Sequence, residues 1–156
     1  MRKSKTGLSI VELVIAVAII TLFLAALVFA FSSFLKLAFS NVKSVKAAFI
    51  LEETIEVVKF LRDASWEDNI APPSAGAYYF LNFTRNSWTI SSSNTFVGSI
   101  FERKFKFEDV SRDSNGKIVE TGGTTDPGTK KLIAEVSWWS GNATTTRTAS
   151  TYITNI

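Results

Sequence analysis

The chain has 156 residues and contains neither cysteine nor histidine, which excludes disulfides, thiol chemistry and cysteine-ligated zinc and removes the commonest general base. Its formal net charge of +3 is supplied by Arg2, Lys3 and Lys5, so the other 14 basic residues balance the 14 acidic ones. The basic isoelectric point is therefore no argument for nucleic-acid binding.

A long apolar run follows the basic N-terminal residues 1–7. The 19 residues from Leu13 to Phe31 carry no charge, and about 20 apolar residues suffice to span a bilayer as a helix. Glu12 lies at the start of this run, where a charge costs roughly 2.5–3.5 kcal/mol even on the more lenient insertion scales. An ionisable residue in such a segment is a functional hypothesis, and it needs a partner.

This stretch resembles the N-terminus of type IV prepilins and pseudopilins. In that family a short basic leader ends in glycine, the first mature residue is hydrophobic, and the fifth is glutamate. Gly7, Leu8 and Glu12 occupy these positions here, although the family most often has phenylalanine where this chain has Leu8. The resemblance implies cleavage after Gly7 by a membrane prepilin peptidase, which also methylates the new amino terminus.

The resemblance implies a minor pilin or pseudopilin, a structural subunit of a type IV pilus or a type II secretion-like filament. Before assembly the chain would cross the cytoplasmic (inner) membrane once, with its globular domain outside, and would contact lipid and the inner-membrane assembly platform. It would then join an extracellular or periplasmic filament and contact other pilin subunits through its N-terminal helix. The expected assembly residues are Glu12 and Leu8, because the carboxylate and the new amine attract strongly in a low dielectric.

Two other interpretations of the N-terminus are open. A secretory signal peptide has an apolar core of about 7–15 residues, and the run here is longer. A plain single-pass anchor fits the length and would keep the basic residues cytoplasmic, but it leaves Glu12 unexplained. In that case the chain would be a monomeric membrane-anchored binding module for DNA or a surface ligand.

Residues 8–31 are therefore predicted to be the membrane or filament-core half of a helix, and residues 32–66 its amphipathic half. Residues 32–63 contain no glycine or proline. Two serines at 32 and 33 suggest a local melting or bend, since their hydroxyls compete for backbone hydrogen bonds. The apolar face predicted for the second half comprises Ala47, Leu51, Ile55, Val58 and Leu61, and the opposite polar face comprises Glu52, Glu56, Lys59 and Asp63.

Residues 67–156 are predicted to form a β-rich globular domain. Phe101, Phe105 and Phe107 alternate with charged residues, so they should share one sheet face, and Arg103 on that face needs an edge position or a partner. The strands expected from composition are 77–83, 87–90, 101–108, 132–139 and 148–153, with turns at Thr84-Arg85-Asn86, Asn115-Gly116 (two-residue) and Asp126-Pro127-Gly128 and a loop at 122–125.

The order of one helix followed by antiparallel strands predicts an α+β fold. It matches the pilin architecture, in which a C-terminal antiparallel sheet packs against the second half of a long N-terminal helix. The function expected is structural rather than enzymatic, with no cofactor and no metal.

The β-rich domain contains two further candidate sites. Residues 111–122 have Asp, Asn and Gly at calcium-loop offsets, but Ser111 and Gly122 replace the first and twelfth ligands, so a hairpin turn is preferred. Asp109, Asp113 and Asp126 stay as a secondary calcium hypothesis. Lys104 and Lys106, with Arg103 and Lys117 near in sequence, are a secondary hypothesis for a DNA-binding patch.

Overall fold

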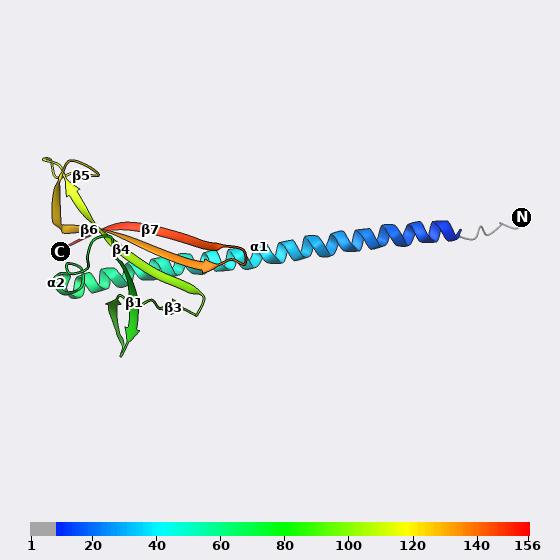
Figure 1. Ribbon diagram of the computed structural model, residues 1–156, viewed down its shortest axis with the longest axis horizontal. Coiled ribbons are helices and arrows are strands. Elements are labelled where there is room, and N and C mark those ends of the chain that lie inside the picture. Colours follow the sequence, from blue (N-terminus) through cyan, green and yellow to red (C-terminus); the bar gives the residue numbers. More distant parts are fainter. Residues whose placement is uncertain (1–8) are drawn as a thin grey trace, which may run out of the picture. The chain divides into compact units, whose positions relative to one another are not determined.

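The computed structural model describes residues 9–156. A helix, α1 (Ile10–Ala64), is followed by a short helix α2 (Trp66–Asn69) and by a seven-stranded antiparallel sheet (Figure 1). The predicted α+β class is confirmed. The residues up to Val42 and the residues from Lys43 to Ile156 form two compact units, and each is described by itself.

Helix α1 is close to the predicted span of 8–63 and continues without interruption through Ser32 and Ser33. The predicted melting there is wrong. The Ser33 hydroxyl donates a hydrogen bond to the carbonyl oxygen of Phe29 at 3.0 Å, so it adds to the helical pattern instead of replacing it.

Within the second unit, one face of α1 is buried. The buried positions are Ala47, Ile50, Leu51, Thr54, Val57, Val58 and Leu61, which recur at the three- and four-residue spacing of a helix packed on one side. Ile55, predicted for this face, is only partly buried at its margin. Thr54 is fully buried instead, because its hydroxyl donates to the Ile50 carbonyl at 2.6 Å and needs no other partner.

The short helix α2, which has its own N-cap, follows the end of α1. Ser65 is the N-cap of α2, and its side chain accepts a hydrogen bond from the backbone N–H of Asp68. This places Trp66 in the core, where it covers the end of the apolar face.

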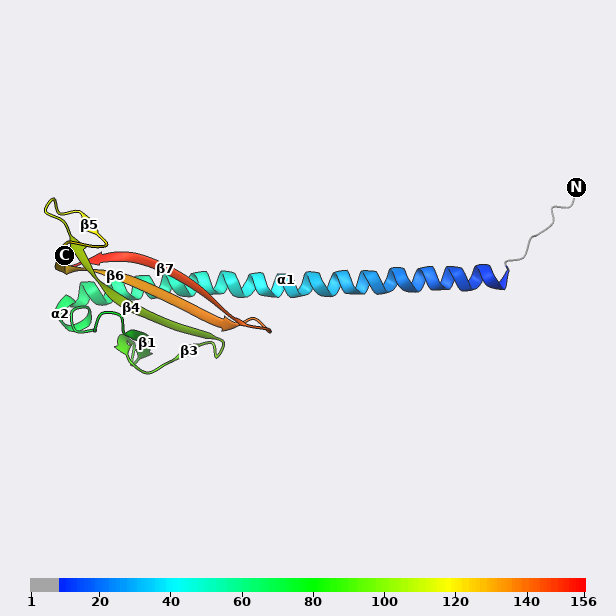
Figure 2. The same ribbon diagram turned by 45° about the horizontal axis from the view of Figure 1, so that its top comes forward.

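The strands are β1 (Tyr78–Thr84), β2 (Ser87–Ser91), β3 (Phe96–Val97), β4 (Phe101–Arg112), β5 (Ile118–Val119), β6 (Thr124–Trp139) and β7 (Thr144–Thr154). The main order across the sheet is β2-β1-β4-β6-β7, and β3 and β5 also pair with β4. Figures 1 and 2 both show β4, β6 and β7 running beside the second half of α1, while the β1–β2 hairpin turns aside. Thus β4 is the strand with the most partners.

The first predicted turn is confirmed and the second needs correction. Arg85 and Asn86 both have positive φ, as a two-residue turn between β1 and β2 requires. The β4–β5 hairpin has a longer loop than the predicted two residues, because the Asp113 N–H donates to the Lys117 carbonyl and the Gly116 N–H to the Asp113 carbonyl. The Asp113 carboxylate also accepts the N–H groups of Asn115 and Lys117, each at 2.9 Å, which fixes this wider loop.

The predicted turn at Asp126-Pro127-Gly128 is wrong as a chain reversal. Asp109 pairs with Lys130 and Val110 with Asp126, so residues 127–129 form an irregularity within β6. The bulge suits proline, which cannot donate a ladder hydrogen bond. The chain therefore continues in one strand, and the predicted loop at 122–125 shortens because β6 begins at Thr124.

The core lies between α1 and the inner face of the sheet. Phe101, Phe105 and Phe107 are buried there, as the alternation predicts, together with Leu132 and Val136 of β6. Phe105 and Phe107 pack edge to face with ring centroids 5.5 Å apart, which is a favoured aromatic arrangement.

Candidate functional site

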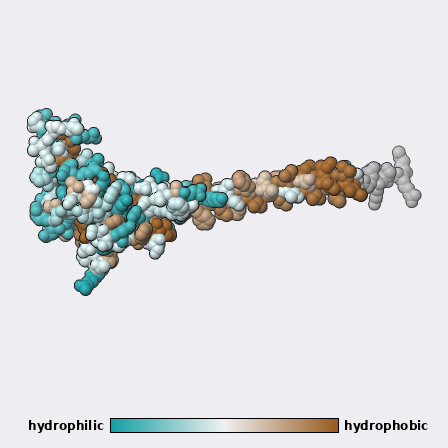
Figure 3. Space-filling view, viewed as in Figure 1, coloured by the Kyte–Doolittle hydropathy of each residue, from teal (hydrophilic) through white to brown (hydrophobic). Residues whose placement is uncertain are grey.

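The first half of α1 exposes its apolar side chains on every side. All the large apolar residues from Ile10 to Phe31 are more than half exposed, and Figure 3 shows hydrophobic residues covering this part of the helix. The helix is long and apolar enough to span a membrane. A surface of this kind needs lipid or other apolar helices around it.

Glu12 lies in the first turn of this helix and closes a capping interaction. The Ser9 backbone N–H donates to the Glu12 carboxylate at 3.3 Å, and the Leu13 N–H donates to the Ser9 carbonyl at 3.1 Å. Ser9 is thus the residue before the helix, and Glu12 is its third helical residue, the positions of a capping box. The carboxylate also lies at the positive end of the helix dipole.

The sequence carries a signal for this contact in addition to the resemblance to prepilins. Serine followed three residues later by glutamate, before an apolar run, is the signature of a capping box. Glu12 is predicted to pair with an amine created at Leu8, whereas in the structure its carboxylate accepts a hydrogen bond from the Ser9 amide. Gly7 and Leu8, the expected processing residues, lie outside the described residues, so the predicted amine–carboxylate pair stays a prediction.

Arg103, which lies on the apolar face of the sheet, has a charged partner in Glu53. Its guanidinium bonds to Glu53 of α1 at 3.1 Å and to the Leu81 carbonyl at 3.2 Å, and it lies 5.2 Å from the centre of the Trp88 ring. Only 6 % of the residue is exposed. Arg103 therefore ties the helix to the sheet and contributes no charge to an outer surface.

The other cations of the predicted basic patch are engaged on the outer sheet face. Lys104 lies 3.9 Å from Glu135, and Lys106 lies 2.8 Å from Glu108. The ion pair with Lys106 lowers the pKa of Glu108 and raises that of Lys106. Lys117 stands in the β4–β5 loop. The structure thus does not gather the four cations into one patch.

Tyr78 joins this outer network from β1. Its hydroxyl donates to Glu135 at 2.8 Å, and the Lys104 ammonium lies 4.5 Å from its ring centre. The hydrogen bond to the carboxylate raises the pKa of the Tyr78 phenol. Alternating charges and a shared aromatic ring hold three neighbouring strands together, which is a structural use of ionisable groups.

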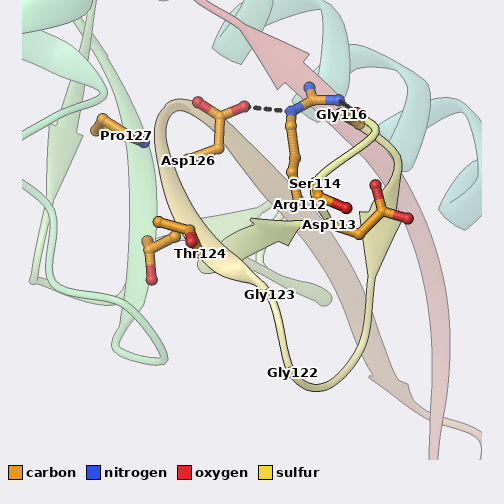
Figure 4. A pocket seen from close by; sticks show the side chains of 10 residues that line it. Arg112, Asp113, Ser114, Gly116, Gly122, Gly123, Thr124, Asp126 and Pro127 are labelled. Carbon is orange, nitrogen blue, oxygen red and sulfur yellow. Dashed lines mark hydrogen bonds and ion pairs between the residues drawn. The ribbon is translucent and has the colours of Figure 1, made fainter.

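An open cavity of about 840 Å³ lies between the β4–β5 loop and the beginning of β6 (Figure 4). Arg112 is its principal cation, and it donates to Asp126 at 2.6 Å, to the Gly116 carbonyl at 2.8 Å and to the Thr129 hydroxyl at 3.1 Å. The guanidinium beside Asp126 lowers the pKa of that carboxyl group. These bonds cross-link the loop to the β6 bulge and leave Asp126 committed to Arg112.

Within residues 9–156, no group of three or more acidic, histidine or cysteine side chains is placed to hold a metal ion. Asp113 of the secondary calcium hypothesis accepts backbone N–H groups, and Asp126 pairs with arginine. Both carboxylates thus have structural partners in place of a cation.

No family model, curated protein or solved structure matches this chain. The features of this chain that bear on function are the exposed apolar half of α1 and Glu12 at its start.

Proposed function

We propose that this chain is a minor pilin or pseudopilin, a structural subunit of a type IV pilus or type II secretion-like filament. It is made with a basic leader, held in the cytoplasmic membrane by the first half of α1, and cleaved after Gly7 by the prepilin peptidase, which methylates the new terminus. The assembly platform then moves it from lipid into the filament. The observation that supports this proposal is an apolar helix exposed on all sides with one carboxylate, Glu12, at its start.

The carboxylate explains why the helix would leave lipid for a filament. In the precursor, Glu12 is held by the Ser9 amide, a neutral partner. Cleavage creates a positive amine at Leu8, and an ion pair in a low-dielectric surrounding is far stronger than in water. Lipid tails supply no further positive group at this depth, whereas a neighbouring subunit supplies its own terminal amine, so the charge of Glu12 favours assembled subunits.

Processing is tested by intact-mass measurement of the native protein. The proposal expects loss of residues 1–7 and the addition of one methyl group. A Gly7→Glu variant should retain the leader and stay out of the filament, while Gly7→Ala serves as the matched small-residue control. A native protein that keeps its leader would favour the anchored binding module instead.

Assembly is tested by replacing Glu12 in two ways that the capping contact distinguishes. Glu12→Gln keeps an oxygen that can accept the Ser9 N–H but removes the charge, whereas Glu12→Leu removes both. We expect both variants to insert into the membrane and be cleaved, and both to be depleted at least tenfold from the sheared filament fraction. Normal incorporation of Glu12→Gln with failure of Glu12→Leu would assign Glu12 to helix capping and contradict its role in assembly.

A further inference from the structure

The second unit has an exposed apolar edge close to the point where the chain enters it. Trp139 at the end of β6 is 59 % exposed, and Ile100, which precedes the first residue of β4, is 52 % exposed. The two lie at the same end of the sheet, because the neighbouring Phe101 and Trp138 pack with ring centroids 5.8 Å apart. Large apolar side chains at an exposed sheet end are a candidate interaction surface.

Lysines of α1 flank this edge. The Lys43 ammonium donates to the Trp139 backbone carbonyl at 3.1 Å, which holds the β6–β7 turn against the helix. Lys46 follows one turn later and is exposed. Among the described residues, the ion pairs include neither lysine, and the sequence between Glu12 and Glu52 contains no acidic residue.

The nearest carboxylate along β4, that of Glu102, has its partners within the sheet. Glu102 accepts hydrogen bonds from Asn94 at 2.6 Å and from Ser137 at 3.1 Å, and it lies 4.0 Å from Lys104. It is thus engaged within the sheet. The edge formed by Lys43, Lys46, Ile100 and Trp139, called here the basic-aromatic edge, therefore combines positive charge with exposed apolar side chains.

Only a short length of chain separates this edge from the apolar run of α1, which limits how far the edge can lie from a membrane that the run enters. Lys43 is 12 residues beyond Phe31, a rise of about 18 Å in a helix and at most about 42 Å at full extension. Beyond Phe31 the helix carries Ser32, Ser33 and Lys36 among further apolar residues as far as Phe39, which is 67 % exposed and four residues before Lys43. The edge is thus within reach of the lipid headgroups, whose layer adds several ångströms to each side of the hydrocarbon.

We propose that the basic-aromatic edge binds anionic lipid headgroups while the chain is anchored in a membrane. Tryptophan is favoured at the membrane interface, where its ring has one apolar and one wet side. Each lysine near an anionic surface contributes attraction that falls off within a Debye length. The proposal rests on the membrane-anchored state of the proposed function and adds a lipid contact made by the globular unit.

The test uses the full chain in nanodiscs of phosphatidylcholine alone or of three parts phosphatidylcholine to one part phosphatidylglycerol. A trace of lipid carrying a nitroxide on its headgroup quenches nearby tryptophans. We expect the quenched fraction of fluorescence to be at least twofold greater in the anionic discs and to fall by more than half in Trp139→Phe. It should not fall in the matched control Trp88→Phe. Lys46→Gln and raised salt should each reduce the anionic excess.

Equal quenching of wild type and Trp139→Phe, or equal quenching in the two lipid compositions, would overturn the proposal. Shielding of Trp139 that appears only as protein density rises would assign the edge to a second copy of the chain and also overturn it. Alkaline extraction distinguishes failure of the proposed lipid contact from failure of the proposed membrane anchoring. A chain that resists extraction but shows no Trp139 quenching loses only the lipid contact, whereas an extractable chain loses both proposals.

Discussion

The first half of α1 is richer in apolar residues than the second half, and the two halves use these residues in opposite ways. Up to Val42 no position of the described helix is buried, whereas the second half buries seven residues on one face against the sheet. The second half thus has its partner within the chain, and the first half requires one from outside. Hydrophobicity alone therefore does not identify a core, because the one-sided spacing in the second half carries that information.

The largest expected contrast comes from removing one phenylalanine in each region. Phe105→Ala empties a fully buried site and should lower the free energy of unfolding by about 3–5 kcal/mol. Phe23→Ala, in the exposed first half, should leave it unchanged. Guanidinium unfolding of the full chain in detergent, followed by near-ultraviolet circular dichroism, measures both. Equal destabilisation by the two variants would contradict the division of roles.

A helix breaker in the second half should have the next largest effect. Ile55→Pro removes a helix hydrogen bond and introduces a clash, which costs about 3 kcal/mol or more. Ile55→Ala is the matched control, and it should cost much less because Ile55 is only partly buried. Unchanged thermal stability of the proline variant would argue against a packed helix at this point.

The polar link between α1 and the sheet should matter less. Glu53→Gln keeps an oxygen near Arg103 but removes the opposing charge from a buried guanidinium. Because Glu53 is itself half exposed, we expect a loss of about 1 kcal/mol, between the values for exposed ion pairs and for charged hydrogen bonds. Glu56→Gln, which affects only the exposed pair with Lys59, should cost about 0.3 kcal/mol. The same unfolding assay ranks the two variants, and the reverse order would contradict the link.

The smallest expected effect is that of Asp126→Asn, and it depends on pH. Since the pKa of Asp126 is lowered in the folded chain, its ionised form contributes stability above the ordinary carboxyl pKa of about 3.9. That contribution disappears as the pH falls through the lowered folded value. The variant should therefore melt slightly below wild type at neutral pH and together with it at strongly acidic pH. In an Arg112→Gln background the substitution should have no further effect at neutral pH, and a persistent difference there would exclude the ion pair as the cause.

The sequence predicted the parts of the fold that depend on local periodicity. Ala47, Leu51, Val58 and Leu61 face the core as their helical spacing required, and Phe105 and Phe107 do so by strand alternation. These patterns predict the buried residues correctly because burial on one side of a helix or strand makes apolar residues recur at a regular spacing.

The parts that the sequence did not predict depend on contacts made at a distance or on side chains with two uses. The two-residue strands β3 and β5 exist only because β4 offers them hydrogen bonds, and so they carry no periodic signal of their own. Side-chain hydrogen bonds of Asp113 and Asp126 accompany the two departures from the expected turns, which are the wider β4–β5 loop and the bulge within β6. At the candidate site, the capping-box spacing of Ser9 and Glu12 is present in the sequence. A glutamate at the start of an apolar run can, however, be explained either by helix capping or by pairing with an amine.

The central position of β4 sets an order of events for a chain that is made from its N-terminus. Strand β4 pairs with β6 from Glu102 opposite Ser137 to Arg112 opposite Thr124, and β6 supplies Leu132, Ala134 and Val136 to the core. The apolar face of α1 therefore lacks the part of its cover that β6 supplies until residue 139 has left the ribosome. While some seventy-five residues after the end of α1 are synthesised, the sheet-binding face of the helix is exposed. During that period this apolar face is a surface that a chaperone would bind.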